Sequence, residues 1–166
     1  MKMELIQPFI NAADAVLADG LKSPVSIASL TMEQEAYRRK GVAALVWVTG
    51  DIEGRMVIDL DSETAVRVAS QFAGQELPSS DALVKETVCE LANQVVGNAI
   101  TSLNDEGFHF RAHPPVLHTS ERGPQGTEDT EALVICLETT SGDVYMNIAL
   151  RYKHDLTQPR VAGAGR

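Results

Sequence analysis

Basic residues, cysteines and long apolar runs are all scarce in this chain of 166 residues. Lys and Arg number 14 against 23 Asp and Glu, and the resulting net charge of −9 argues against nucleic-acid binding, because phosphate backbones are held by basic side chains. The longest purely apolar run, over 42–48, is too short to span a bilayer. Cys89 and Cys136 lie in apolar stretches and no signal core is seen, so we expect reduced thiols in a cytoplasmic protein.

What the chain does contain is one order of elements that occurs twice. Each half has the pattern of a helix, a strand and a hairpin, although the two halves share little sequence identity. The expected elements are helices over 8–19 and 79–105, single strands over 24–35 and 108–120, and hairpins over 42–61 and 132–151. The pattern predicts an α+β fold with a duplicated α-β-β-β unit, in which helices pack on an antiparallel sheet.

A helical crossover over 62–75 is expected to join the two units, with Ser62 as its N-cap and Gly74 as its C-terminal stop. The crossover would lie within a single domain over 1–153, between a first repeat over about 8–61 and a second over about 79–152. Residues 154–166 have few large apolar side chains, which predicts a flexible tail.

The helix expected over 79–105 has two distinct faces. One face is apolar and should lie on the sheet: Val84, Val88, Leu91, Val95, Ala99 and Leu103. A second stripe at the same spacing is polar and small: Glu86, Glu90, Asn93, Gly97 and Thr101. A mid-helix glycine costs about 1 kcal/mol relative to Ala, so Gly97 indicates either a close approach by a partner or the packing of a neighbouring helix.

Glu90 and Asn93 lie one helical turn apart, so their side chains project side by side. An acid and an amide without a nucleophile and its base do not suit acyl transfer. They can position a reactant and a partner, because the amide can hold a water and the acid can anchor a cation on the partner. Phosphoryl transfer is the reaction in which positioning and charge compensation supply most of the catalysis. The alternative is that the stripe is an ordinary solvent-exposed helix surface with no function in binding or catalysis.

Three segments together resemble the CheC and CheX family of chemotaxis phosphatases: TGDIEGRMVIDLDSETAVRVAS (49–70), CELANQVVGNAI (89–100) and HPPV (113–116). The resemblance implies removal of the phosphoryl group from an aspartyl-phosphate on a CheY-like receiver. It implies that Asn93 orients the attacking water and that Glu90 pairs with a receiver Lys. The chain itself would bind no metal or other cofactor, because Mg²⁺ belongs to the receiver.

The resemblance also implies a partner-binding surface and a homodimer joined through edge strands. The surface would comprise Glu86, Gln94, Gly97 and Asn98 beside the catalytic pair. Glu86 departs from the Asp or Ser that relatives often carry there, which leaves the docking partner of that position open. Some relatives carry a second site on the first helix; here Glu4 and Gln7 have the spacing but are expected to precede a helix that begins at Pro8, so one site is expected.

Two other interpretations of the sequence are less favoured. The same fold could serve as a non-catalytic docking or adaptor module that binds a receiver or a flagellar-switch component. A zinc site formed by His109, His113 and His118 is disfavoured, because no carboxylate or Cys at suitable spacing completes a tetrahedral ligand set.

Overall fold

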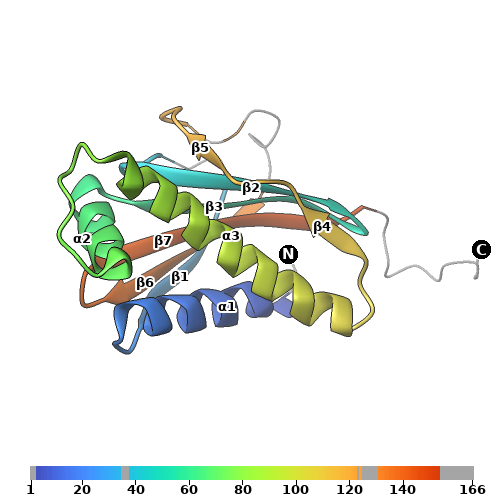
Figure 1. Cartoon of the computed structure of the whole chain (residues 1–166). Coiled ribbons are helices and arrows are strands. Elements are labelled where there is room, and N and C mark those ends of the chain that lie inside the picture. Colours follow the sequence, from blue (N-terminus) through green and yellow to red (C-terminus); the bar gives the residue numbers. More distant parts are fainter. Residues whose placement is uncertain (1–2, 35–37, 123, 125–130, 154–166) are drawn as a thin grey trace, which may run out of the picture.

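The computed structural model describes residues 3–34, 38–122, 124 and 131–153, and the tail expected over 154–166 lies outside them. The helices are α1 (Met3–Leu21), α2 (Ser62–Ala73) and α3 (Ala82–Asp105). The strands are β1 (Ser26–Gln34), β2 (Val42–Gly50), β3 (Ile52–Leu60), β4 (Phe110–Ala112), β5 (Val116–His118), β6 (Glu131–Thr139) and β7 (Gly142–Tyr152). Figure 1 shows the helices on one side of the sheet. In the described part of the chain, none of the helices is both long and apolar enough to cross a membrane.

The sheet confirms the duplicated α-β-β-β fold. Within the described residues it has seven antiparallel strands in the order β1-β6-β7-β3-β2-β4, and β5 also pairs with β2. The order is symmetric about the central β3–β7 pair, because each unit gives its first strand to the other unit's hairpin. Strand β1 of the first unit pairs with β6, and β4 and β5 of the second unit pair with β2.

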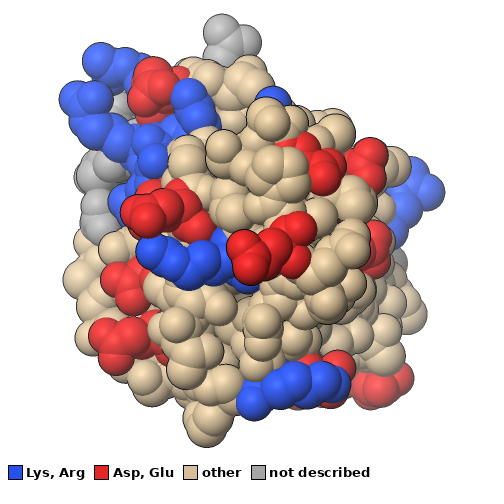
Figure 2. Space-filling view, turned by 60° about the vertical axis from the view of Figure 1, so that its left-hand side comes forward, with Lys and Arg blue, Asp and Glu red and all other residues tan. Residues whose placement is uncertain are grey.

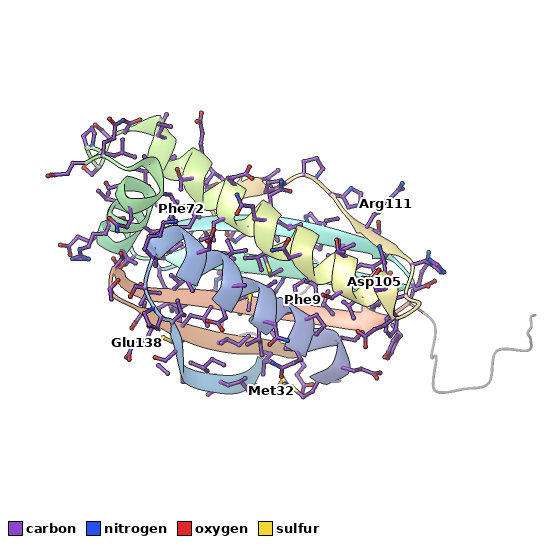
Figure 3. All side chains as sticks on the ribbon, turned by 60° about the horizontal axis from the view of Figure 1, so that its bottom comes forward. Phe9, Met32, Phe72, Asp105, Arg111 and Glu138 are labelled. Atoms are coloured by element: carbon purple, nitrogen blue, oxygen red, sulfur yellow. The ribbon has the colours of Figure 1, made fainter. Side chains whose placement is uncertain are left out.

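The expected apolar face of the long helix is buried. Its six members are each 2% exposed or less, and they join one core with the helix-facing residues of β2, β3, β6 and β7. Figure 3 shows α1 and α3 side by side on the sheet, with Phe9 placed between them. This packing fixes the rotation of α3 about its axis, and the opposite stripe therefore points away from the protein.

Helix α1 begins earlier than Pro8, and this part of the prediction was wrong. The helix starts at Met3 and contains Pro8 in its second turn. Leu5 and Ile6 are each 1% exposed, and burying two such side chains contributes about 1.5–3 kcal/mol each. That gain, about 3–6 kcal/mol for the two side chains, offsets the roughly 3 kcal/mol that a proline costs inside a helix. Glu4 and Gln7 therefore belong to the helix and do not precede it.

The N-caps of α2 and α3 are both aspartates. Asp61, not Ser62 as expected, caps α2: its Oδ1 accepts a hydrogen bond from the backbone N–H of Thr64 at 2.8 Å. That bond is the largest cause of the lowered pKa of Asp61. Asp81 caps α3 through the N–H of Leu83 at 2.9 Å, so α3 starts at Ala82 and not at residue 79. Gly74 ends α2 in the left-handed conformation, as expected.

The single strand expected over 108–120 is two strands, β4 and β5, each of three residues. Both pair with β2, at opposite ends of it. Between them lie His113, Pro114 and Pro115. The interruption follows from the prolines, which have no N–H to donate to a strand ladder.

The face of the sheet opposite the helices carries a buried polar cluster. Arg55, Asp59 and Asn147 are 2%, 1% and 5% exposed. Arg55 Nη1 donates to the backbone carbonyl of Asn147 at 3.1 Å and also to its side-chain oxygen. The Asp59 carboxylate accepts from the backbone N–H groups of Lys40 and Gly41, at 2.8 Å and 3.3 Å. Asp59 thereby fixes the chain that enters β2.

Asp59→Ala is expected to lower the free energy of unfolding by about 2–3 kcal/mol, because two backbone N–H groups lose a charged acceptor whose side chain is buried. Urea denaturation followed by circular dichroism measures the change. Asp14→Ala, at an exposed position of α1, is the matched control and should change stability little. Equal effects of the two substitutions would contradict the anchoring role of Asp59.

Candidate functional site

The outer face of α3 presents the polar stripe that the sequence predicts. Glu86, Glu90, Asn93, Gly97 and Thr101 are all exposed, opposite the buried face of the same helix. Gln94 and Asn98, the other expected contact residues, are also exposed and flank the stripe. The structure therefore brings every predicted site residue to one continuous surface, and the rigid helix sets their spacing.

Glu90 and Asn93 form the central pair of this surface. They are three residues apart, which places their Cα atoms about 4.5 Å apart along the helix axis. Gln94 Nε2 donates to Glu90 Oε1 at 3.3 Å, so the acid is held from the C-terminal side. Among the described residues, none hydrogen-bonds to the Asn93 amide, which is left to bind water or a partner. The pair can anchor a cation and hold a water side by side.

Gly97 does not serve packing within the described chain. A Cβ added at this glycine would meet no heavy atom within 4 Å, apart from neighbours in its own helix. The alternative that Gly97 admits a neighbouring helix is therefore wrong here. The glycine leaves a shallow site in the exposed stripe, one turn beyond Asn93, where an outside molecule can approach the helix backbone.

Helix α1 carries a counterpart of the Glu90–Asn93 pair. Much of the burial pattern of α1 repeats that of α3 with a displacement of 86 positions, and at six corresponding pairs both members are buried. These pairs are Leu5/Leu91, Ile6/Ala92, Phe9/Val95, Ile10/Val96, Ala13/Ala99 and Leu17/Leu103. The same displacement matches Glu4 to Glu90 and Gln7 to Asn93, and Glu4 and Gln7 are both exposed. The sequence analysis recognised the spacing of Glu4 and Gln7 but placed both residues before the helix, because it began the helix at Pro8.

The counterpart pair on α1 is bound within the chain. Tyr152 donates its hydroxyl hydrogen to Glu4 Oε1, and Gln7 Nε2 donates to Asn11 Oδ1 at 2.9 Å. Burial, followed by the bond to Glu4, raises the pKa of Tyr152 to about 12, so the phenol stays protonated and the bond persists at neutral pH. Asn11 stands where α3 has Gly97, which fills the shallow site on α1.

Comparison with known proteins identifies the family of this chain. The family model for chemotaxis phosphatase CheX matches residues 42–138, more than half of the chain. The chain belongs to the CheX family. A curated relative, the CheY-P phosphatase CheX of Thermotoga maritima, is 31% identical over 77 residues. That alignment covers 46% of this chain and 50% of the relative, so the chain matches only half of that protein's length.

Solved structures resemble the CheX-family chain over nearly its whole length. A chain of the CheX–CheY–BeF₃–Mg²⁺ complex from Borrelia burgdorferi is 32% identical, with a TM-score of 0.71 over 90% of this chain and 99% of that one. A CheC-like protein from a Shewanella species has a TM-score of 0.79 at 20% identity, covering 91% and 99% of the two chains. CheX from Vibrio vulnificus has a TM-score of 0.76 at 21% identity, covering 89% and 99%. The last two support the fold alone.

Other chemically capable residues of this CheX-family chain lie away from the stripe. Among the described residues, no group of three or more His, Cys, Asp and Glu is arranged to hold a metal ion. His113 Nε2 lies 3.1 Å from Thr49 Oγ1, and this hydrogen bond joins the end of β4 to β2. Burial raises the thiol pKa of both Cys89 and Cys136, which keeps them protonated and weakly reactive.

Three exposed apolar side chains on α3 and the neighbouring strand β5 were missed by sequence reasoning: Leu83, Val116 and Leu117. They are 39%, 50% and 40% exposed. Leu83 lies in the first turn of α3, and the other two belong to β5, which lies beside α3. No signal in the sequence could have grouped them, because the pairing of β5 with β2 is what brings β5 to the helix.

Proposed function

We propose that this chain hydrolyses the aspartyl-phosphate of a CheY-like response regulator. The observation that carries the proposal is an exposed acid and an exposed amide, Glu90 and Asn93, one turn apart on the outer face of α3 in a CheX-family chain. The names of two relatives, a CheY-P phosphatase and a CheX–CheY complex, support the same substrate. Reduced thiols, both with a raised pKa, fit the reducing cytoplasm as the place of this activity.

In this proposal, Asn93 binds the attacking water through its amide and orients it in line with the phosphorus atom. The water's oxygen forms a bond to phosphorus, the bond from phosphorus to the receiver's aspartate breaks, and free carboxylate and inorganic phosphate result. Glu90 pairs with a Lys of the receiver's active site and fixes the docking, and Gln94 restrains Glu90. Positioning of this kind supplies most of the catalysis in phosphoryl transfer.

Mg²⁺ enters the proposal with the substrate. The receiver's own carboxylates would hold it, and it would neutralise charge on the phosphoryl oxygens. The chain's contribution is then an amide, an acid and a close-fitting helix surface: Glu86, Gln94, Gly97 and Asn98 would contact the receiver around the central pair.

One active site per chain is part of the same proposal. The counterpart pair on α1 has its acid bound to Tyr152 and its amide bound to Asn11. Gln7 is also one methylene longer than the asparagine of α3. Both groups thus already have a partner within the chain, whereas none of the described residues hydrogen-bonds to the Asn93 amide.

Turnover distinguishes this phosphatase from a docking module of the same fold. A small amount of the chain, mixed with excess phosphorylated CheY-like receiver and Mg²⁺, should release phosphate from many receiver molecules per molecule of chain. A docking module would bind the receiver and release phosphate no faster than the receiver does alone. The measurement is loss of acyl-phosphate against time.

We also propose that two copies join through β1 into a homodimer. Strand β1 is an edge strand of nine residues, and its positions 26–32 are all exposed. Ile27, Leu30 and Met32 are 50%, 43% and 46% exposed, and Figure 3 places Met32 at the margin of the sheet. An open edge with apolar side chains favours pairing with another strand. The opposite edge has only the short β4 and β5, so the assembly would close at two copies.

Leu30→Lys is expected to convert the dimer to a monomer. The two-fold axis of the dimer would bring the two added ammonium groups toward each other in an apolar interface, where they repel. Sedimentation equilibrium measures the mass in solution. Leu117→Lys, on the opposite edge, is the control and should stay dimeric. A wild-type chain that is monomeric at all concentrations would overturn the dimer proposal.

A further inference from the structure

The large apolar side chains that are exposed in the described residues form two groups at opposite edges of the sheet. The first group belongs to α1 and β1: Met3, Ile27, Leu30 and Met32. The second group belongs to α3 and β5: Leu83, Val116 and Leu117. The β1 dimer proposed above would cover the first group and leave the second in solvent.

Two members of the second group, Leu83 and Leu117, border the polar stripe of α3. Val116 pairs with Leu45 and so points to the opposite face of the sheet. Leu83 precedes Glu90 by seven residues, or two helical turns, and so projects from the same face of the helix. Leu117 pairs with Ala44, whose side chain lies in the core beneath the helices, so Leu117 points to the helix side of the sheet. Figure 1 shows β5 beside the N-terminal half of α3. The two leucines therefore flank the docking face at its N-terminal end.

Strand β5 is unsuited to binding a second copy by sheet extension. It has three residues and follows Pro114 and Pro115, which cannot donate to an added strand. A partner must instead contact β5 through side chains, as in the apolar centre of a protein interface. Leu83 and Leu117, which are 39% and 40% exposed, provide that centre.

Basic residues lie on the far side of β5. Arg39 joins the chain before β2 to the chain after β5: its N–H donates to the Glu121 carbonyl at 3.0 Å, and its Nη2 pairs with Glu121 Oε1 at 2.7 Å. The junction brings its sequence neighbours Arg38 and Arg122, both exposed, to the same part of a chain of net charge −9. Lys40 instead lies with its Nζ 4.3 Å from the ring centroid of Tyr145. Figure 2 shows a gathering of Lys and Arg at one upper corner of the molecule.

The apolar group thus has acids on one side, Glu86 and Glu90, and cations on the other. A partner that matches both must present a positive group and negative groups around an apolar contact. A phosphorylated receiver fits this pattern, because its reacting site combines a Lys with carboxylates and a phosphoryl group. The charge order also fixes the orientation in which such a partner can dock.

We propose that Leu83 and Leu117 form the apolar anchor of the receiver-docking surface. The inference rests on the proposed function and names a part of the same surface that touches no reacting atom. The anchor contributes to the affinity of the complex and leaves the chemical step unchanged. Its loss therefore raises KM and leaves kcat as it was.

Leu117→Ser is expected to raise KM for the phosphorylated receiver about tenfold, the change that about 1.4 kcal/mol of lost binding produces. Leu83→Ser should act in the same direction, and either substitution leaves the fold intact because both positions are exposed. Val116→Ser is the matched control, since Val116 precedes Leu117 in β5 and is 50% exposed but points to the opposite face of the sheet. The control should leave KM unchanged.

Direct binding separates failure of the anchor from failure of the proposed function. The probe is a CheY-like receiver activated with beryllofluoride and Mg²⁺, titrated by calorimetry into wild type, Leu117→Ser and Leu83→Ser. Weaker binding by both variants supports the anchor, even if wild type shows no turnover and the phosphatase proposal fails. Unchanged binding and KM in both variants, in a chain that does turn over, would overturn the anchor alone. A wild-type chain that binds no receiver would overturn both proposals.

Discussion

Asn93→Ala is expected to lower kcat for dephosphorylation by about 10²-fold or more, because a positioned group that acts only in the transition state is removed. Docking should hardly change, since Glu90 and the surrounding contacts remain. Stability should hardly change either, because Asn93 is exposed and no described residue bonds to its side chain. Steady-state kinetics with a phosphorylated CheY-like receiver, together with binding to a beryllofluoride-activated receiver, measures the two effects separately.

Gln7→Ala is the matched control for this substitution. Gln7 is an exposed amide at the corresponding position of α1, and its removal should leave kcat and KM unchanged. Glu90→Ala should behave differently from both, weakening docking as well as turnover because the ion pair with the receiver Lys is lost. Turnover at the wild-type rate by Asn93→Ala would exclude the role proposed for the amide.

Gly97→Leu is expected to stabilise the free chain and to damage the complex. Leu is a better helix former than Gly by about 0.8 kcal/mol, and nothing in the described chain lies within 4 Å of an added Cβ at this position. A receiver that approaches the helix backbone here meets the new side chain, and overpacking of about 1–3 kcal/mol corresponds to a loss of kcat/KM of up to about 10²-fold. Thermal unfolding and kcat/KM, measured on the same preparation, reveal the opposite signs.

Ala15→Leu provides the comparison for Gly97→Leu. Ala15 is exposed on α1, away from the proposed docking face, so the added bulk should leave kcat/KM unchanged. A Gly97→Leu chain that bound the receiver as tightly as wild type would show that no partner approaches the helix at this glycine. The glycine would then be without a function in docking.

The buried face of α3 could be predicted because it depends on local periodicity alone. Apolar residues from Val84 to Leu103 recur every three or four positions, and only one rotation of the helix buries them all. That rotation also fixed the opposite stripe, so the exposure of Glu90 and Asn93 followed from the same pattern. The hairpins were predictable for the related reason that strand alternation and turn residues are both local.

The start of α1 could not be predicted from local rules. Proline is common in the first turn of a helix, and local propensity therefore favours a helix that begins at Pro8. The helix begins at Met3 because Leu5 and Ile6 find a core to enter, and that core is built by the rest of the chain. The error mattered for function, since it removed Glu4 and Gln7 from the helix on which they match the α3 pair.

The apolar anchor beside the stripe depends on contacts between segments far apart in sequence. Leu83 and Leu117 approach the same surface only because β5 pairs with β2, over which α3 packs. Neither leucine has a local pattern that separates it from a core residue. Site residues on a single helix could therefore be predicted from the sequence. Residues that strand pairing brings together from distant segments could be identified only from the structure.

Single-turnover decay of a phosphorylated CheY-like receiver, saturated in turn with wild type, Asn93→Ala and Gln7→Ala in the presence of Mg²⁺, tests the central claim most directly. The account predicts rapid loss of acyl-phosphate with wild type and Gln7→Ala, and decay no faster than that of the free receiver with Asn93→Ala. Rapid decay with Asn93→Ala, or slow decay with Gln7→Ala, would contradict a single active site built on α3.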